Sequence, residues 1–335
     1  MSQVAHGLTG IALLSCLALP AQAATPPDTS PHKVRFITVD KGVKLEVLDW
    51  GGSGPPMIFI AGLGETAHEF DTFAPKFTNK HHVYGITRRG FGLSSSPPPT
   101  DDNYDADRLG DDVIAVIDSL KLNHPPILIG SSMGGEELSS VGTRHPDKVA
   151  ALIYLNATYS ESYYDPTKVW DPWVDSALIR RRLAELTNAT PSRSRVLIAE
   201  IQALLPHLKK SLQTALEENR GLPDWPMQPD TQESKNMWAM IHAERQYSDI
   251  KPPMLVIASL PQNCTANCET PAIKAQAAEW AEQLKSVELG LPSAQIVRIP
   301  NSDHRVFLSN GPEVMREMTI FMDGLPRSLA AGREP

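Results

Sequence analysis

A serine flanked by two glycines is the clearest chemical feature of the sequence. It is Ser132, in the middle of Gly130-Ser131-Ser132-Met133-Gly134, directly after the apolar run Pro126–Ile129. A serine hydroxyl is a weak nucleophile, and a tight turn from a strand into a helix presents it to both base and substrate. Glycines two positions to either side relieve the crowding of such a turn. The pattern predicts a catalytic nucleophile at Ser132; the alternative is an ordinary glycine-serine loop.

A general base for this serine is predicted at His304, in Asn301-Ser302-Asp303-His304. Of the ten histidines in the sequence, only His304 stands just beyond the final predicted strand. The apolar residues Val306-Phe307-Leu308 follow it and are expected to pack this loop down. The alternative interpretation is a structural histidine.

The elements that must position these two residues alternate between strands and helices. We expect strands over residues 33–39, 44–49, 57–61, 83–86, 127–129, 149–155, 254–258 and 295–299. We expect helices over residues 70–77, 106–122, 272–287 and 312–322, and one that opens directly after the Gly-x-Ser-x-Gly turn. Such alternation indicates an α/β fold with a mostly parallel sheet and helices on both faces.

A helical block interrupts the alternation. Residues 159–250 carry no strong strand pattern, and helices are expected over residues 175–186, 194–205, 208–219 and 232–246. The sequence therefore predicts a core formed by residues 32–158 and 251–326, with the block inserted as a cap. The cap is expected over the carboxyl edge of the sheet, where open α/β sheets bind their ligands.

These features resemble the α/β-hydrolase family, and in particular its serine esterases and lipases. The resemblance extends over nearly the whole chain that follows residues 1–24. The segment from Arg88 to Ser94, Arg-Arg-Gly-Phe-Gly-Leu-Ser, is similar to the family's Arg-Gly-Phe-Gly-x-Ser segment. The resemblance implies an oxyanion loop after the third strand, where this chain has Ala61-Gly62-Leu63-Gly64 in place of the common His-Gly-x. The backbone N–H groups of Leu63 and Met133 would then form the oxyanion hole.

The carboxylate that should orient the histidine is missing from the places where the family carries it. One place holds Asn156, and the loop after the later strand holds Asn263. Glu269 is the acid we favour, because a disulfide between Cys264 and Cys268 would hold its loop near His304. The alternatives are Glu161, Asp165 and an asparagine that orients the histidine, as in some cysteine proteases.

The resemblance implies a carboxylesterase that cleaves a small or medium apolar ester through an acyl-Ser132 intermediate. Four other activities of the family use the same serine and remain alternatives: those of lactonases, carbon–carbon bond hydrolases, cofactor-free haloperoxidases and acyltransferases. The missing acid motivates a further alternative, a ligand-binding homologue without turnover. No cofactor or metal is expected, and the partner is a small-molecule substrate.

Composition and the N-terminus predict where the protein works. The formal net charge is −8 and no basic run exceeds Arg180–Arg182, so nucleic acid is not an expected partner. Residues 1–24 hold an apolar run and the small-residue sequence Ala21-Gln22-Ala23-Ala24, which is typical of a cleaved signal peptide. We therefore expect a periplasmic or secreted protein without stable membrane insertion after cleavage; lipid anchoring at Cys16 is the alternative. In that compartment Cys264 and Cys268 are expected to form a disulfide.

Overall fold

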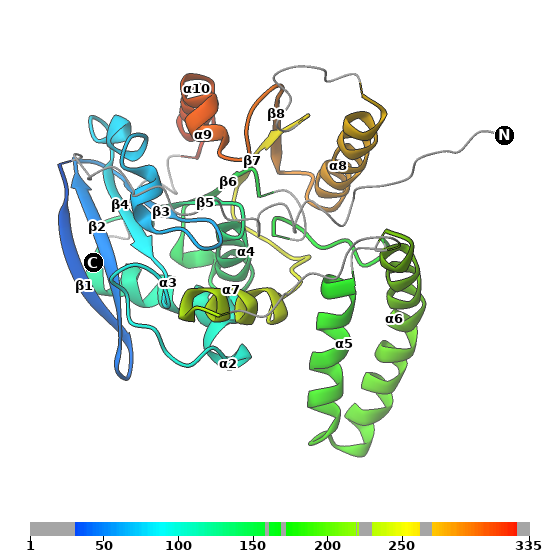
Figure 1. The fold of residues 1–335 in the computed structure, drawn as a ribbon. Coiled ribbons are helices and arrows are strands. Elements are labelled where there is room, and N and C mark those ends of the chain that lie inside the picture. Colours follow the sequence, from blue (N-terminus) through cyan, green and yellow to red (C-terminus); the bar gives the residue numbers. More distant parts are fainter. Residues whose placement is uncertain are drawn as a thin grey trace.

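The centre of the molecule is an eight-stranded sheet. The computed structural model describes residues 31–157, 161–168, 172–218, 220, 230–261 and 270–326. The strands are β1 (Lys33–Asp40), β2 (Val43–Gly51), β3 (Pro56–Ile60), β4 (His82–Thr87), β5 (Ile127–Ser131), β6 (Ala151–Leu155), β7 (Met254–Ser259) and β8 (Gln295–Ile299). They are arranged in the order β1-β2-β4-β3-β5-β6-β7-β8 (Figure 1). β2 is antiparallel to both of its neighbours and all other pairs are parallel, which confirms the predicted mostly parallel sheet.

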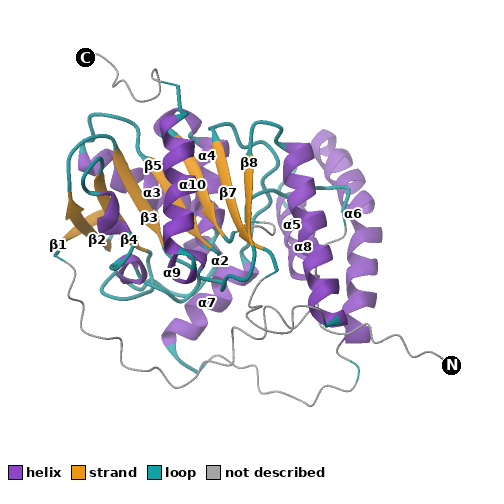
Figure 2. Ribbon diagram, turned by 90° about the horizontal axis from the view of Figure 1, so that it is seen from above, coloured by secondary structure: helices purple, strands orange, loops and turns teal. Residues whose placement is uncertain are grey.

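Helices cover both faces of the sheet (Figure 2). One face packs against α3 (Ala106–Leu120), α4 (Gly134–Arg144) and α8 (Pro271–Gly290). The other packs against the short helices η1 (Ala67–Phe70), η2 (Ala74–Phe77) and α9 (Val306–Ser309), and against α10 (Gly311–Asp323). The remaining short elements are α2 (Asp101–Tyr104) and η3 (Pro146–Lys148).

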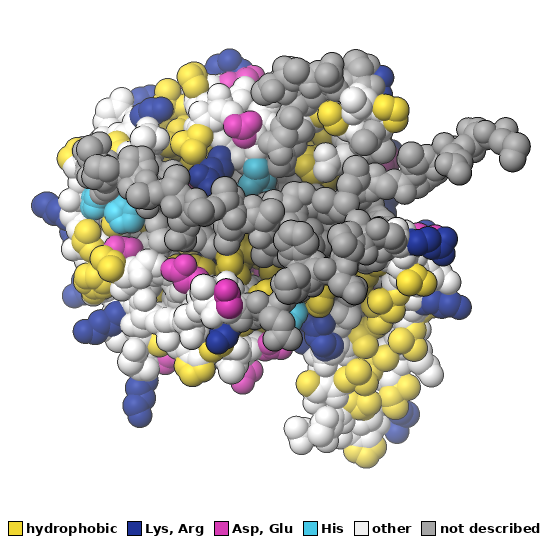
Figure 3. All heavy atoms as spheres, viewed as in Figure 1, with side chains coloured by type: hydrophobic (Ala, Val, Ile, Leu, Met, Phe, Trp, Pro, Cys, Tyr) yellow, Lys and Arg dark blue, Asp and Glu magenta, His cyan; other side chains and the backbone are white. Residues whose placement is uncertain are grey.

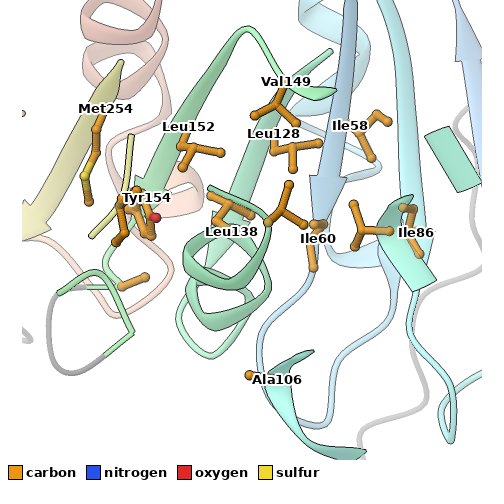
Figure 4. Packing of buried hydrophobic residues seen from close by; sticks show 14 of the residues in the cluster. Ile58, Ile60, Ile86, Ala106, Leu128, Leu138, Val149, Leu152, Tyr154 and Met254 are labelled. Atoms are coloured by element: carbon orange, nitrogen blue, oxygen red, sulfur yellow. The ribbon is translucent and has the colours of Figure 1, made fainter. Parts of the chain in front are cut away.

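The central strands are apolar because neither face meets water. Every residue of β3, β5, β6 and β7 is buried, as expected for parallel strands covered on both sides. On the α4 face, Leu138 packs among the side chains of these strands, which include Ile60 and Leu128 (Figure 4). The helix that follows the predicted nucleophile is thus fixed to the sheet by core packing.

The chain between β6 and β7 forms three helices, α5 (Pro172–Leu186), α6 (Pro191–Glu218) and α7 (Gln232–His242). α5 and α6 pack side by side as a pair that extends from the sheet region (Figure 1). The surface of α6 carries exposed leucines at 205, 212 and 216. Hydrophobic side chains gather over the α5–α6 pair in Figure 3. In the described residues, no helix has the length and apolar character needed to cross a membrane.

Two of the predicted helical segments were wrong, and the helix expected over residues 232–246 ends at His242. α6 is a single helix through Pro206, where two helices separated at that proline were expected. Leu197 and Ser211 are buried on either side of Pro206, and contacts with α5 hold the helix together although the proline removes one backbone N–H. The helix expected over residues 70–77 is instead η1 and η2, because Pro75 lacks the N–H needed to continue a first helix and opens a new turn.

Candidate active site

Ser132 occupies a sharp turn between β5 and α4. Its backbone φ is +49°, in the left-handed region that side-chain-bearing residues rarely adopt. The Ser132 N–H donates to the carbonyl of Leu155 at 3.1 Å, and the Ser132 carbonyl accepts from the N–H of Gly135 at 2.8 Å. These two bonds hold the strained residue at the carboxyl end of the sheet, the place predicted from the sequence.

The flanking glycines are required by close backbone contacts. A Cβ atom at Gly130 would lie 2.6 Å from the carbonyl oxygen of Gly134. A Cβ atom at Gly134 would lie 2.6 Å from the carbonyl oxygen of Ile60, which belongs to β3. The Gly-x-Ser-x-Gly spacing therefore allows the turn to press against both its own helix and the neighbouring strand.

The predicted oxyanion loop lies beside the serine. A Cβ atom built at Gly62 would be only 3.6 Å from the Ser132 Cβ. Within the described chain, the N–H groups of Leu63 and Met133 donate to no protein acceptor. Two backbone donors without partners next to a strained serine have the composition of an oxyanion hole.

The buried ion pair of Arg88 and Glu137 holds the loop of residues 61–64 in place. The Arg88 guanidinium donates to the carbonyl oxygens of Ala61 and Gly62, both at 2.7 Å. It also pairs with Glu137 of α4 at 2.7 Å, and both side chains are almost fully buried. Arg88 thus joins the predicted oxyanion loop to α4, the helix that follows Ser132.

Glu69 is a site residue that the sequence reasoning missed. Its Oε1 accepts a hydrogen bond from the Gly62 N–H at 2.8 Å. Burial raises the pKa of Glu69 to about 7, although this hydrogen bond and the nearby Arg305 charge act in the opposite direction. Glu69 follows Gly62 by seven residues across an irregular turn, so no periodic pattern marks it as a neighbour.

His304 lies in the loop between β8 and α9. Ser302 holds this loop to the end of β7, because its carbonyl accepts from Ser259 Oγ and its own hydroxyl donates back, both at 2.7 Å. Burial, with a smaller contribution from the Arg305 charge, lowers the pKa of His304. No hydrogen bond joins Ser132 Oγ to the His304 ring within the described chain, and such contacts often tighten only when substrate binds.

The residue that faces His304 Nδ1 is Asn156. Its Nδ2 lies 3.0 Å from Nδ1 and 3.2 Å from the His304 carbonyl oxygen. Asn156 directly follows β6 with φ +50°, and its N–H donates to the Ile257 carbonyl at 2.7 Å. Its Oδ1 accepts from the N–H of Ser259 at 2.9 Å. The sequence left several alternatives for the residue that orients His304, and in the structure the asparagine lies beside the ring.

The three carboxylates predicted as candidates for the catalytic acid differ in what the structure shows of them. Glu269 lies outside the described residues, so its role stays a prediction. Asp165 accepts from the backbone and hydroxyl of Thr167, at 2.9 and 2.6 Å. The charge of Glu161 contributes to the raised pKa of the buried Glu136. In the described chain neither carboxylate contributes to the pKa of His304.

The helix α7 supplies apolar side chains above the oxyanion loop. A Cβ at Gly64 would lie 2.9 Å from the Met237 sulfur, and Met237 packs in one cluster with Leu63 and Met133. Near the start of α5, Trp173 stacks on His242 at the end of α7 and is 43% exposed. Among the described residues, no three His, Cys, Asp or Glu side chains are grouped so that they could hold a metal ion.

Comparison with known proteins gives a consistent family. A model of the alpha/beta hydrolase family matches residues 57–317. The chain is 28% identical to a 2-(acetamidomethylene)succinate hydrolase of Mesorhizobium japonicum, over 32% of this chain and 37% of that protein. It is 26% identical to a 2-hydroxymuconate semialdehyde hydrolase of Pseudomonas sp. (strain CF600), over 48% of this chain and 62% of that one. It is 30% identical to a bifunctional esterase/perhydrolase of Acinetobacter calcoaceticus, over 36% and 44%. The matches thus span less than two thirds of each relative.

Solved structures support the fold. A structure described among novel epoxide hydrolases from hot environments superposes with a TM-score of 0.57 at 19% identity, covering 88% of this chain and 99% of that one. The crystal structure of E-2-(acetamidomethylene)succinate hydrolase superposes with a TM-score of 0.53 at 17% identity, covering 88% and 100%. At these identities the likeness concerns the fold alone.

Proposed function

Because this chain belongs to the alpha/beta hydrolase family, we propose that it is a serine hydrolase that cleaves a small or medium apolar ester. Ser132 is the nucleophile and His304 the general base. The observation that carries this proposal is the strained Ser132 beside the N–H groups of Leu63 and Met133, which have no acceptor among the described residues. A turn with a residue at φ +49° persists only where its surroundings enforce it, and such strain gathers at functional sites.

The reaction proceeds in two halves. Ser132 Oγ attacks the ester carbonyl carbon and its proton passes to His304, while the Leu63 and Met133 N–H groups bind the oxyanion. The protonated histidine then gives its proton to the departing alcohol, which leaves an acyl-serine. Water loses a proton to His304, attacks the acyl group and releases the carboxylic acid. Each oxyanion donor typically contributes about 3 kcal/mol to the stabilisation of the transition state.

The preference for an apolar acyl group is supported by the cluster above the oxyanion loop. Leu63, Met133 and Met237 pack together there, and Met237 comes from the helical block inserted between β6 and β7. A flexible thioether beside the reacting carbon suits apolar groups of varied shape.

A ligand-binding protein without turnover is the second candidate. The observation that favours it is Asn156, an amide in hydrogen-bonding distance of His304 Nδ1, where hydrolases of this type carry a carboxylate. An amide cannot stabilise the charged imidazolium that acylation creates.

Turnover of p-nitrophenyl esters with two- to eight-carbon acyl groups separates these candidates. A hydrolase gives saturable release of p-nitrophenol that disappears in Ser132→Ala and falls strongly in His304→Ala. A rate in Ser132→Ala equal to that of the unaltered protein contradicts the proposed nucleophile. Binding of the esters without any turnover supports the second candidate.

We also propose export of the protein and a bridge between Cys264 and Cys268, both of which lie outside the described residues. Production of the full chain in a bacterial host tests both parts. Export predicts a periplasmic product whose mass lacks about the first 24 residues, and the bridge predicts thiols that alkylate only after reduction. A full-length cytoplasmic product, or thiols that alkylate without reduction in exported protein, contradicts the respective part.

A further inference from the structure

The orientation of the Asn156 side-chain amide is fixed by two backbone groups. Its Oδ1 accepts from the N–H of Ser259 at 2.9 Å, and its Nδ2 donates to the carbonyl of His304 at 3.2 Å. A flipped amide would place its NH₂ against the Ser259 N–H and its oxygen against the His304 carbonyl. Both contacts would be repulsive, so the hydrogen-bonding network assigns the NH₂ group to the side that faces the His304 ring.

This orientation determines which ring nitrogen of His304 carries the proton. The Asn156 Nδ2 lies 3.0 Å from Nδ1 and can only donate, so Nδ1 must be the acceptor. A neutral imidazole holds one N–H, which then resides on Nε2. An imidazolium would bring N–H against N–H at Nδ1. The neighbouring Arg305 charge and burial of the ring also favour its neutral form.

We propose that Asn156 is a positioning residue that holds neutral His304 in the Nε2–H tautomer. This inference rests on the proposed function of the same site. The resting site then offers Ser132 a hydrogen-bond donor in place of a base. Acylation first requires the ring proton to leave Nε2 and a proton to be taken up at Nδ1, against the Asn156 NH₂. The chain is therefore a hydrolase with an intact nucleophile and a restrained base.

Asn156→Asp tests this inference because the substitution changes one atom at the decisive contact. One carboxylate oxygen keeps the hydrogen bond from the Ser259 N–H. The other accepts a hydrogen bond from a protonated His304 Nδ1, which leaves Nε2 unprotonated and able to act as the base. Aspartate also tolerates the left-handed backbone at φ +50°. The carboxylate oxygen that faces Nδ1 also lies against the His304 carbonyl oxygen, which repels it. We therefore expect the gain in kcat to be smaller than the about 10⁴-fold loss that the opposite substitution, aspartate to asparagine, causes in a serine protease.

We expect the kcat for p-nitrophenyl acetate to rise at least tenfold in Asn156→Asp, with KM changed less than threefold. The kcat of the variant should follow a single ionisation, that of His304, over pH 5–8. Asn123→Asp is the matched control, because Asn123 is exposed and the change adds the same charge outside the site. This control should leave kcat unchanged.

The ¹⁵N shifts of histidine-labelled protein report the tautomer directly, and His304→Gln assigns the His304 signals. The unaltered protein should show a protonated Nε2 and an unprotonated Nδ1, and Asn156→Asp should show the reverse. A protonated Nδ1 in the unaltered protein overturns the inference, whether or not the aspartate variant folds. An unchanged kcat in a folded Asn156→Asp variant with the reversed tautomer also overturns it.

The inference and the proposed function fail in different ways. If the unaltered protein turns over esters at Ser132 and carries its proton on Nδ1, the proposed function stands and the inference falls. If the proton is on Nε2 and neither the unaltered protein nor Asn156→Asp turns over any ester, the assignment of the tautomer stands and the proposed hydrolase falls.

Discussion

The carboxyl group of Glu69 accepts a hydrogen bond from the Gly62 N–H at 2.8 Å and thereby holds the proposed oxyanion loop. Burial raises the pKa of this carboxyl from 4.5 to about 7. Between these values the unfolded chain loses its proton while the folded protein keeps it. Rising pH therefore favours the unfolded chain over this window.

Glu69→Gln should remove this contribution, since an amide oxygen can still accept from Gly62 but does not titrate. We compare the unfolding free energy of the unaltered protein with that of Glu69→Gln. As the pH rises from 4.5 to 7, the value of the unaltered protein should fall by about 1–3 kcal/mol more than that of the variant. Urea unfolding at several pH values measures the difference. Parallel pH dependence of the two proteins would contradict a raised pKa at Glu69.

Gly134→Ala should damage the nucleophile turn. The added Cβ would lie 2.6 Å from the Ile60 carbonyl oxygen, and a backbone atom of the central sheet cannot easily move away. We expect a loss of about 1–3 kcal/mol in unfolding free energy, with a fall in kcat larger than stability explains. Gly311→Ala is the control, because its new Cβ would meet nothing closer than 3.9 Å. Equal effects of the two substitutions would argue against a tightly packed turn.

Arg88→Met should release the oxyanion loop and leave Glu137 as an unpaired buried charge. Breaking a buried pair in this way costs about 3–5 kcal/mol. Adding Glu137→Gln should restore part of the stability, because the stranded charge is gone. It should not restore kcat, because the carbonyls of Ala61 and Gly62 still lack their donor. Urea unfolding and ester turnover of the single and double variants measure both effects, and recovery of kcat in the double variant would contradict the role of Arg88 in the loop.

The strand-to-helix turn at Ser132 and the sheet could be predicted from the sequence because their signals are local. Gly130, Ser132 and Gly134 lie within five residues of one another, directly after an apolar strand. His304 was also placed correctly, in the loop after the last strand of the sheet. Both predictions depend on periodicity and on order along the chain, which a single sequence contains.

The partner of His304 depends on long-range geometry that local patterns do not encode. Asn156 and His304 are 148 positions apart, and only the parallel pairing of β6, β7 and β8 brings their loops together. The left-handed backbone at Asn156 aims its side chain at the ring, and an asparagine tolerates that conformation without marking it in the sequence. The single α6 was missed for a related reason, because packing on α5 overrides the effect of Pro206.

A fluorophosphonate probe tests the central claim, that Ser132 is a nucleophile poised beside an oxyanion hole, most directly. Peptide mapping by mass spectrometry should find one phosphonylated residue, Ser132, in folded protein and none after denaturation. The reaction should be faster in Asn156→Asp and absent in Ser132→Ala. Folded protein that stays unlabelled both unaltered and as Asn156→Asp, or a label at another serine, would contradict the assignment of Ser132 as the nucleophile.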